Sequence, residues 1–421
     1  MIGQHSTQSE NQSCPHLGEK YQPFVNPQLD DPYSFYKLAR QQEPLFYSPL
    51  LNGYVLTSYD EILKVLKDPA RFSSADTLAP VIRFTPETVE ALKQGVPKVR
   101  DLVNSDGEEH KRLRAPFMKV FAPERLEAME GPIHTIANRL VDNFVNDGHA
   151  DIIQQFSYPL PLEAILTMYG IASDRMADLK KWCYDMDELL STPMTPERQL
   201  ECARSFVSMQ HYVASLIEER RKAPEDDLIS NVLSSDLNMV ELVSILCGLI
   251  QAGHKTSSHL IGNALKHLLE HPQLWQTICD NPSLIPTAIE EILRYDAPVT
   301  SMTRTTTEEV ELAGVTLPKN ARIYLIYGSA NRDETKYSNA DSLDLERFKE
   351  VTPNHLAFGH GVHRCIGSHF ARREARIALE ILSKRLPNLR LRPNQELTHS
   401  PNMIFRGYSH LEVEWDVAPK G

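Results

Sequence analysis

The chain has 421 residues, of which 24% are charged and 41% are hydrophobic, and its formal net charge at pH 7 is −12. These proportions are typical of folded globular proteins and exclude a disordered or fibrous chain. The acidic balance also argues against a nucleic-acid partner, because phosphate backbones are bound by clustered Lys and Arg.

The beginning of the chain is polar and has no apolar segment of the signal-peptide kind, and no stretch approaches the roughly 20 apolar residues of a membrane helix. We therefore expect a cytoplasmic protein that makes no membrane contact. Because no Gly/Ser linker or internal repeat divides the chain, we predict a flexible N-terminal tail over residues 1–22 and a single domain over residues 23–421.

Segments with strand character are short, such as residues 53–57 and 322–326, whereas helical patterns fill most of the remaining chain. Proline occurs 28 times and punctuates the helices. This distribution predicts a mainly α fold with small β-sheets, of the α+β class.

The most informative helical pattern covers residues 239–271, where Asn238 followed by Glu241 gives a capping signal and a proline ends the run. At about 1.5 Å per residue this helix is about 50 Å long. Between Val243 and Gly253 it is apolar or small on every side, which predicts a path through the core. Gly253 costs the helix roughly 1 kcal/mol against alanine. A close approach explains it, either by a flat ligand or by a neighbouring helix.

Four strings of the form ExxR occur along the chain, and alone each predicts an i,i+3 surface ion pair worth a few tenths of a kcal/mol. They are Glu109/Arg112, Glu201/Arg204, Glu218/Arg221 and Glu291/Arg294. Spacing by itself does not distinguish one of them from the others.

A loop rich in glycine, residues 358–367, delivers Cys365 to the start of an amphipathic helix that runs from residue 366 to about residue 386. Backbone N–H groups and the helix dipole favour the thiolate there, and glycines let the backbone approach a flat macrocycle. A thiolate held in this way suits an axial ligand of haem iron. The alternatives are an ordinary buried cysteine and a zinc site with His355, His360 and His363, whose spacing fits no standard zinc site.

This loop resembles the cysteine-loop signature of cytochromes P450. The residues at the family's characteristic positions are Phe358, Gly359, Gly361, His363, Cys365 and Gly367. The resemblance covers nearly the whole chain from Pro23 to the turn at residues 406–407, and it includes residues 330–333. It implies a P450 fold in which Cys365 ligates the iron of haem b (iron-protoporphyrin IX), with the long helix on the opposite side of the haem.

Within this resemblance, one ExxR string acquires a specific role. Glu291 and Arg294 stand before the cysteine loop in the family's order, and Arg347 resembles the downstream arginine that completes a buried ion network. The resemblance implies a structural function for this network. Removing one partner would leave a buried charge at a cost of about 3–5 kcal/mol.

The resemblance also implies the side chains that contact the haem. The propionates need cations or hydrogen-bond donors, and the residues at matching positions are His110, Arg114, Arg304 and His363. Each alone could be a solvated side chain, but His110 and Arg114 are one helical turn apart and share a face. The other expected cofactor contacts are Ala252, Gly253, Phe358, Gly359, Cys365 and Gly367.

Residues 252–256 resemble the P450 distal-helix signature, in which a small residue and a glycine leave room for O2. Thr256 takes the place of the oxygen-activating threonine, whose hydroxyl holds a proton-carrying water chain. The family usually has Asp or Glu before this threonine, whereas this chain has Lys255. Three hypotheses follow for Lys255. It relays protons as a partly neutral amine, it pairs with a carboxylate of protein or substrate, or it points outward while water alone delivers protons.

The implied function is a haem-thiolate monooxygenase that inserts one oxygen atom from O2 into a medium-sized organic substrate. Electrons would come from a separate ferredoxin or flavodoxin with its NAD(P)H reductase. The alternatives are a P450-fold peroxygenase, suggested by Lys255, and a non-catalytic haem binder or gas sensor.

Two surfaces complete the expected picture. The substrate pocket is expected at the family's substrate-contacting segments, namely Val81, Ile82, Phe84, Gln251, Val299, Thr300, Met302 and Ile404. The electron donor is expected on the cysteine side, where the cations that could attract it are Lys111, Arg112, Arg372 and Arg373. Ordinary surface charge explains these four cations equally well.

Overall fold

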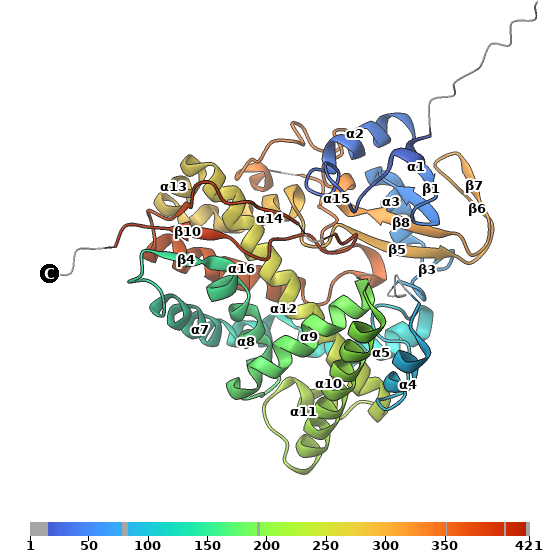
Figure 1. The fold of residues 1–421 in the computed structure, drawn as a ribbon, viewed down its shortest axis with the longest axis horizontal. Helices are drawn as coiled ribbons and strands as arrows, with labels where there is room; N and C mark the ends of the chain where they lie inside the picture. The colour runs from blue at the N-terminus through green and yellow to red at the C-terminus, as the bar shows by residue number, and fades with distance from the viewer. Residues whose placement is uncertain (1–15, 78–82, 192–193, 351, 400, 418–421) are drawn as a thin grey trace, which may run out of the picture.

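The computed structural model describes residues 16–77, 83–191, 194–350, 352–399 and 401–417. Helices supply most of the described chain and surround one long helix, while small sheets lie toward the two ends of the molecule (Figure 1). This is the predicted α+β architecture. Residues 1–15 of the predicted tail and the pocket candidates Val81 and Ile82 lie outside the described residues.

The helices are α1 (Leu17–Lys20), α2 (Tyr33–Gln42), α3 (Tyr59–Lys67), α4 (Pro86–Leu92), α5 (Gly107–Val120), α6 (Pro123–Ala128), α7 (Glu130–Asp142), α8 (Pro159–Met168), α9 (Met176–Ser191), α10 (Pro196–Lys222), α11 (Leu228–Val232), α12 (Met239–Glu270), α13 (Pro272–Asp280), α14 (Ile285–Tyr295), α15 (Tyr327–Ala330) and α16 (Ser368–Arg385). The strands are β1 (Leu45–Ser48), β2 (Gly53–Leu56), β3 (Phe72–Ser73), β4 (His149–Asp151), β5 (Ser301–Thr306), β6 (Val310–Leu312), β7 (Val315–Leu317), β8 (Arg322–Ile326), β9 (Arg390–Leu391) and β10 (Glu412–Glu414).

The central helix α12 matches the helix predicted from the sequence. The Asn238 side chain accepts a hydrogen bond from the Glu241 backbone N–H (3.1 Å), and the Glu241 carboxylate accepts one from the Asn238 N–H (2.9 Å). This capping box fixes the start of the helix. The helix then crosses the middle of the molecule and packs against α8, α10, α14 and α16 (Figure 1).

The largest sheet has the strand order β1-β2-β8-β5-β3, in which β2 and β8 run parallel and the other neighbours antiparallel. The segments predicted as strands at residues 53–57 and 322–326 are β2 and β8. Arg304 lies on β5 opposite Ile323 of β8. A second sheet, β4-β10-β9, joins the last described strand to the middle of the chain.

Part of the predicted flexible tail is folded. Helix α1 buries Leu17 and the following Tyr21, and a Cβ on Gly18 would overlap the carbonyl oxygen of Tyr47 in β1. The prediction for residues 17–21 was therefore wrong, because two apolar side chains in a polar context suffice to anchor this short segment. That residues 23–421 form one domain stays a prediction.

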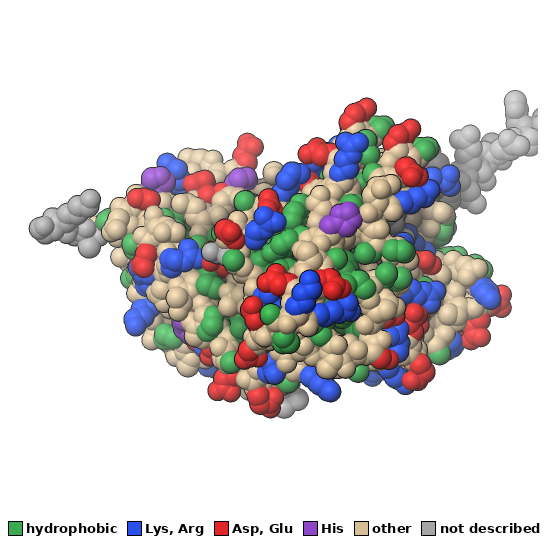
Figure 2. Space-filling model, turned by 90° about the horizontal axis from the view of Figure 1, so that it is seen from below, with side chains coloured by type: hydrophobic (Ala, Val, Ile, Leu, Met, Phe, Trp, Pro, Cys, Tyr) green, Lys and Arg blue, Asp and Glu red, His purple; other side chains and the backbone are tan. Residues whose placement is uncertain are grey.

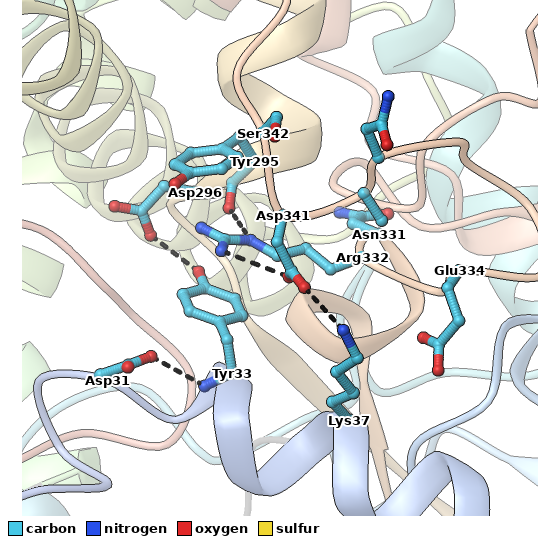
Figure 3. Close-up of polar contacts among 12 residues, drawn as sticks. Asp31, Tyr33, Lys37, Tyr295, Asp296, Asn331, Arg332, Glu334, Asp341 and Ser342 are labelled. Atoms are coloured by element: carbon cyan, nitrogen blue, oxygen red, sulfur yellow. Dashed lines mark hydrogen bonds and ion pairs between the residues drawn. The ribbon is translucent and has the colours of Figure 1, made fainter. Parts of the chain in front are cut away.

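The Arg332 guanidinium lies between two tyrosine rings, 3.5 Å from the Tyr33 centroid and 3.6 Å from the Tyr295 centroid (Figure 3). Its Nε donates to the Tyr295 carbonyl oxygen (2.8 Å). The Tyr33 hydroxyl donates to Asp296 (3.0 Å), and Arg406 donates to the same carboxylate (2.9 Å). This cluster fastens α2 and the C-terminal segment to the end of α14.

No helix within the described ranges is both long and apolar enough to cross a membrane. On the face shown in Figure 2, Lys and Arg side chains are intermixed with Asp and Glu side chains. Neighbouring charges of opposite sign keep electrostatic repulsion low on this face.

Candidate functional site

The cysteine loop is held in shape by two glycines and one backbone hydrogen bond. Gly359 (φ +65°) and Gly361 (φ +70°) adopt the left-handed conformation that glycine tolerates best, and a Cβ on Gly361 would overlap the Leu66 carbonyl oxygen. The Cys365 N–H donates to the Phe358 carbonyl oxygen (2.9 Å). The loop thus closes on itself and presents Cys365 just before α16.

The Cys365 side chain is not covered by other residues, yet the protein around it desolvates the thiol. Both observations are satisfied if the sulfur faces a space enclosed by the fold. Burial raises the pKa of the Cys365 thiol, against the Gly367 N–H and the charges of Arg114 and Arg372, which lower it. The Gly367 N–H acts in the direction predicted for the helix start, toward the thiolate, while desolvation opposes it. Iron ligation by Cys365 stays a prediction. A bound metal would supply the missing stabilisation, because coordination deprotonates a thiol.

One face of α12 is open where the helix crosses the core. Gly248, Ala252 and Thr256 recur every four residues and share this face. Ala252 is exposed and Thr256 is partly exposed, and a Cβ on Gly248 would meet nothing within 4 Å. The Thr256 hydroxyl donates to the Ala252 carbonyl oxygen (2.8 Å). The face leaves room for a small molecule beside the helix.

Gly253 lies on a different side of α12. A Cβ there would be 3.3 Å from Ile165 of α8, which makes helix packing the explanation of this glycine. The glycine on the open face is Gly248, which is not among the residues predicted from the sequence. Its position one turn before Ala252 was the available signal.

Lys255 extends from α12 to α9 and forms an ion pair with Asp187. Its ammonium group also lies 5.0 Å above the centre of the Phe405 ring. Of the three hypotheses for Lys255, the structure corresponds to pairing with a carboxylate of the protein.

Two histidines face each other beside the cysteine loop. His110 of α5 and His363 have ring centroids 4.1 Å apart, and among the described residues neither Nε2 atom has a hydrogen-bond partner although both are buried. The nearest carboxylate oxygen to His363 Nε2 is that of Asp106, at 3.9 Å. Burial, helped by Arg304, lowers the pKa of His363 to about 4. Both rings are therefore available as neutral donors.

Two arginines next to these histidines have no anionic partner among the described residues. Arg304 is buried and donates to the Thr303 carbonyl oxygen (2.7 Å), and Arg114 donates to the Arg364 carbonyl oxygen (2.6 Å). Within the described chain, neither guanidinium forms an ion pair with a carboxylate. A buried cation without a counter-charge is costly, so the cluster is suited to a ligand that carries carboxylates. The four predicted propionate contacts, which lie together, fit the two propionates of a haem.

Replacing Arg304 by leucine should weaken haem retention at least about tenfold, since charge-assisted hydrogen bonds contribute roughly 1.5–3 kcal/mol. The rate of haem transfer to excess apomyoglobin measures this effect. Arg322→Leu on the neighbouring strand β8 is the matched control and should retain haem normally. Equal transfer rates for both variants and the wild type would contradict the assignment of Arg304.

The ExxR segment of α14 forms a buried ion network. Arg294 donates to both carboxylate oxygens of Glu291 (2.8 and 2.7 Å), and both side chains are fully buried. Arg347 donates to the same carboxylate from the other side (3.1 Å). The remaining Arg294 donors bind the Asn331, Ala340 and Ser342 carbonyl oxygens. The network therefore connects α14 with the segment that leads to the cysteine loop.

Glu290 makes a second link from α14 to the loop. It accepts from Arg372 (2.6 Å) and contacts His355 (3.1 Å). Burial would raise the pKa of Glu290, but these two partners lower it to about 2. Arg372 also lies 4.5 Å above the Phe358 ring, so the carboxylate holds the arginine that covers the first residue of the loop.

The predicted pocket residues are brought together only in part. Val299 pairs with Phe405, and the Thr300 N–H donates to the Ile404 carbonyl oxygen (2.8 Å), so these two segments are adjacent. Met302 lies on β5, and Gln251 is partly exposed on α12. Phe84 packs instead against the cluster that α9 and α10 form.

The four cations expected to attract an electron donor each form an ion pair within the chain. The pairs are Lys111–Glu108, Arg112–Glu241, Arg372–Glu290 and Arg373–Glu130. Their charges are thereby largely compensated. In contrast, Arg364 is exposed next to Cys365, and among the described residues it forms no ion pair with a carboxylate.

The chain matches known proteins over most of its length. The sequence profile of the family described as Cytochrome P450 matches residues 54–404. The mycinamicin IV hydroxylase/epoxidase of Micromonospora griseorubida is 34% identical over 375 residues, which are 86% of this chain and 89% of that protein. The P450 heme domain of Tepidiphilus thermophilus superposes with a TM-score of 0.91 at 34% identity, covering 96% of this chain and 98% of that one. An intact type IV self-sufficient cytochrome P450 monooxygenase also gives a TM-score of 0.91 at 31% identity, covering 96% of this chain and 54% of that one.

Proposed function

Because this chain belongs to the cytochrome P450 family and is a monooxygenase of the oxidoreductase class, we propose that it inserts one oxygen atom from O2 into a medium-sized organic substrate at a haem b ligated by Cys365. The observation that carries the proposal is the cluster of donors beside the cysteine loop. The buried Nε2 atoms of His110 and His363 have no hydrogen-bond partner among the described residues, and there neither the buried Arg304 nor the partly buried Arg114 forms an ion pair with a carboxylate. When bound, haem would supply the activation of O2, and the chain would position the haem and the substrate.

The residues of this chain have distinct roles in the proposal. Gly248 and Ala252 keep the face of α12 open for O2 and substrate. The Thr256 hydroxyl donates to the Ala252 carbonyl oxygen, so its lone pairs are available to accept from a water molecule that carries protons. The segments around Thr300 and Ile404 form one wall of the proposed substrate pocket. The apolar surface of this pocket binds the organic molecule.

The proposed electron donor is a separate ferredoxin or flavodoxin supplied by an NAD(P)H reductase, and the proposed location of the enzyme is the cytoplasm. Support comes from Arg364, whose exposed charge is adjacent to Cys365. We expect the partner to approach this surface rather than the four compensated cations. The self-sufficient relative carries additional chain beyond the part that matches, and a fused donor is the alternative arrangement.

The proposal is tested by reducing the haem-loaded protein under carbon monoxide and by assaying O2-dependent product formation with ferredoxin, flavodoxin and their reductases. A band at about 450 nm together with turnover is expected. Folded, haem-loaded protein without that band would refute thiolate ligation. A band without turnover of any screened substrate would favour the non-catalytic haem binder, and equal rates with hydrogen peroxide would favour the peroxygenase.

The ion pair between Lys255 and Asp187 should contribute to stability rather than to proton transfer. A double-mutant cycle with Lys255→Gln and Asp187→Asn, followed by urea unfolding, should give a coupling free energy of about 1 kcal/mol, because the pair is only partly exposed. Lys255→Glu places two carboxylates together and should destabilise the protein while product formed per NAD(P)H stays close to the wild-type value. A severalfold fall in that ratio would instead assign Lys255 to the proton relay.

A further inference from the structure

A groove lies where β2 and β8 begin, outside the site described above. These two parallel strands are neighbours, and each is entered through a short turn, one within the β1–β2 hairpin and the other between β7 and β8. The groove between the turns has a volume of about 430 Å³, which is within the size range of small-molecule sites. The hairpin contributes Tyr47 and Tyr54 to its lining, and the second turn contributes Lys319 and Arg322.

The backbone around the groove is already fixed. Asn52 (φ +46°) and Asn320 (φ +65°) take the left-handed conformation that asparagine tolerates in tight turns. The Asn52 N–H donates to the Pro49 carbonyl oxygen (3.3 Å), and the Asn320 N–H donates to the Thr306 carbonyl oxygen (2.9 Å). A ligand therefore does not have to order these turns, which removes one of the usual costs of binding.

Two cations in the groove lack a counter-charge. The Arg322 guanidinium lies 5.3 Å from the centre of the Tyr324 ring, which fixes its position, but among the described residues it forms neither an ion pair nor a hydrogen bond. The same is true there of the exposed Lys319 ammonium. No Asp or Glu is among the described residues that line the groove, although the whole chain carries a net charge of −12. The groove is thus a local positive site that suits an anion.

Two tyrosines add an aromatic surface to this positive site. The rings of Tyr47 and Tyr54 meet edge to face with their centroids 5.3 Å apart, and the Tyr47 side chain is exposed. The Tyr47 hydroxyl donates to the Asn52 side chain (2.7 Å), which holds the ring in place. Aromatic pairs are more stable than the burial of their area alone explains, so a flat ring is the apolar group that fits this surface best.

We propose that this groove binds a flat aromatic molecule that carries one carboxylate or phosphate group. The ring of the ligand lies against Tyr47 and Tyr54, and its anionic group accepts hydrogen bonds from Arg322 and Lys319. The cations select an anion, and the tyrosines select a ring. The inference does not rest on the proposed function, because no lining residue belongs to the cysteine loop, to the propionate contacts or to the open face of α12.

Calorimetry with naphthoate tests this proposal on the haem-loaded protein, with excess phenylimidazole present to fill the substrate pocket. One binding site per chain is expected. Naphthol has the ring without the charge, and cyclohexanecarboxylate has the charge without the aromatic ring. Each should bind at least about fivefold more weakly than naphthoate. Raising the salt concentration from about 0.05 M to about 0.5 M should weaken the binding of naphthoate but not that of naphthol.

Variants assign the binding to individual side chains. Arg322→Leu should lower the affinity for naphthoate about tenfold, and Lys319→Leu should lower it about threefold. Tyr47→Ser should weaken the binding of both naphthoate and naphthol. Arg390→Leu, in the sheet that contains β9, is the matched control, because Arg390 is also partly exposed but pairs with Glu414. Lys319 is exposed, so its variant provides the test if Arg322→Leu does not fold.

Hydrogen exchange locates the bound probe. Naphthoate should slow amide exchange in residues 47–54 and 318–322 of the wild type and much less in Arg322→Leu. Equal affinities for naphthoate and naphthol, unchanged affinity in both cation variants, or loss of binding when phenylimidazole is present would overturn the proposal. A dimer that protects these two segments without any probe would also overturn it, because a second copy of the chain would then cover the groove.

Discussion

Replacing Cys365 by alanine should abolish oxygen insertion while leaving the protein folded. The side chain is exposed, so its removal creates no packed cavity and should change the free energy of unfolding by less than about 1 kcal/mol. The sulfur is nevertheless the atom proposed to hold the iron, and its electron donation favours O–O cleavage. We expect no band at about 450 nm under carbon monoxide and no product above background.

Cys279→Ala provides the control for this prediction. Cys279 is also a free, incompletely buried cysteine, but it belongs to α13. It should keep both the band and the activity. If Cys365→Ala retained either the band or the activity, another residue would have to be the iron ligand.

Replacing Glu291 by alanine should have the largest effect on folding. It leaves Arg294 and Arg347 facing each other without their shared carboxylate, and a stranded buried charge costs about 3–5 kcal/mol. Since globular proteins are stable by only about 5–15 kcal/mol, much of the variant should be unfolded at 37 °C and contain no haem. The urea midpoint and the haem content of purified protein measure these effects.

A matched control comes from another ExxR string. Glu218 and Arg221 of α10 form an i,i+3 ion pair at 2.7 Å, and both side chains are about half exposed. Glu218→Ala should cost less than about 0.5 kcal/mol. Similar decreases in the free energy of unfolding of Glu291→Ala and Glu218→Ala would show that burial does not distinguish the two ion pairs.

The elements that sequence predicted well are those with local signals. Helix α12 follows from its capping residues and from apolar positions on all sides, and β2 and β8 follow from short runs rich in branched and aromatic side chains. The ExxR strings show the limit of local signals. Glu291/Arg294 and Glu218/Arg221 have the same spacing, and only tertiary packing buries one pair and exposes the other.

Partners that are distant in sequence could not be predicted. Nothing near Lys255 indicates Asp187, because this contact depends on how α9 and α12 pack. The desolvation of the Cys365 thiol could not be predicted for a related reason. The helix start that favours the thiolate is visible in the sequence, whereas the desolvation that outweighs it arises only when the surrounding segments close around the sulfur.

The Arg406 side chain has a consequence for how the protein is made. It donates to Asp296 of the segment that follows α14 and to the backbone carbonyl oxygens of Leu29 and Asp30, nearly the full length of the chain away. Contacts between residues so far apart in sequence form late in folding, because closing the long loop between them first costs conformational entropy. This part of the attachment of the N-terminal region cannot form until the C-terminal segment has left the ribosome. Stable cofactor capture is therefore expected after synthesis, and nascent chains arrested before residue 406 should retain haem poorly.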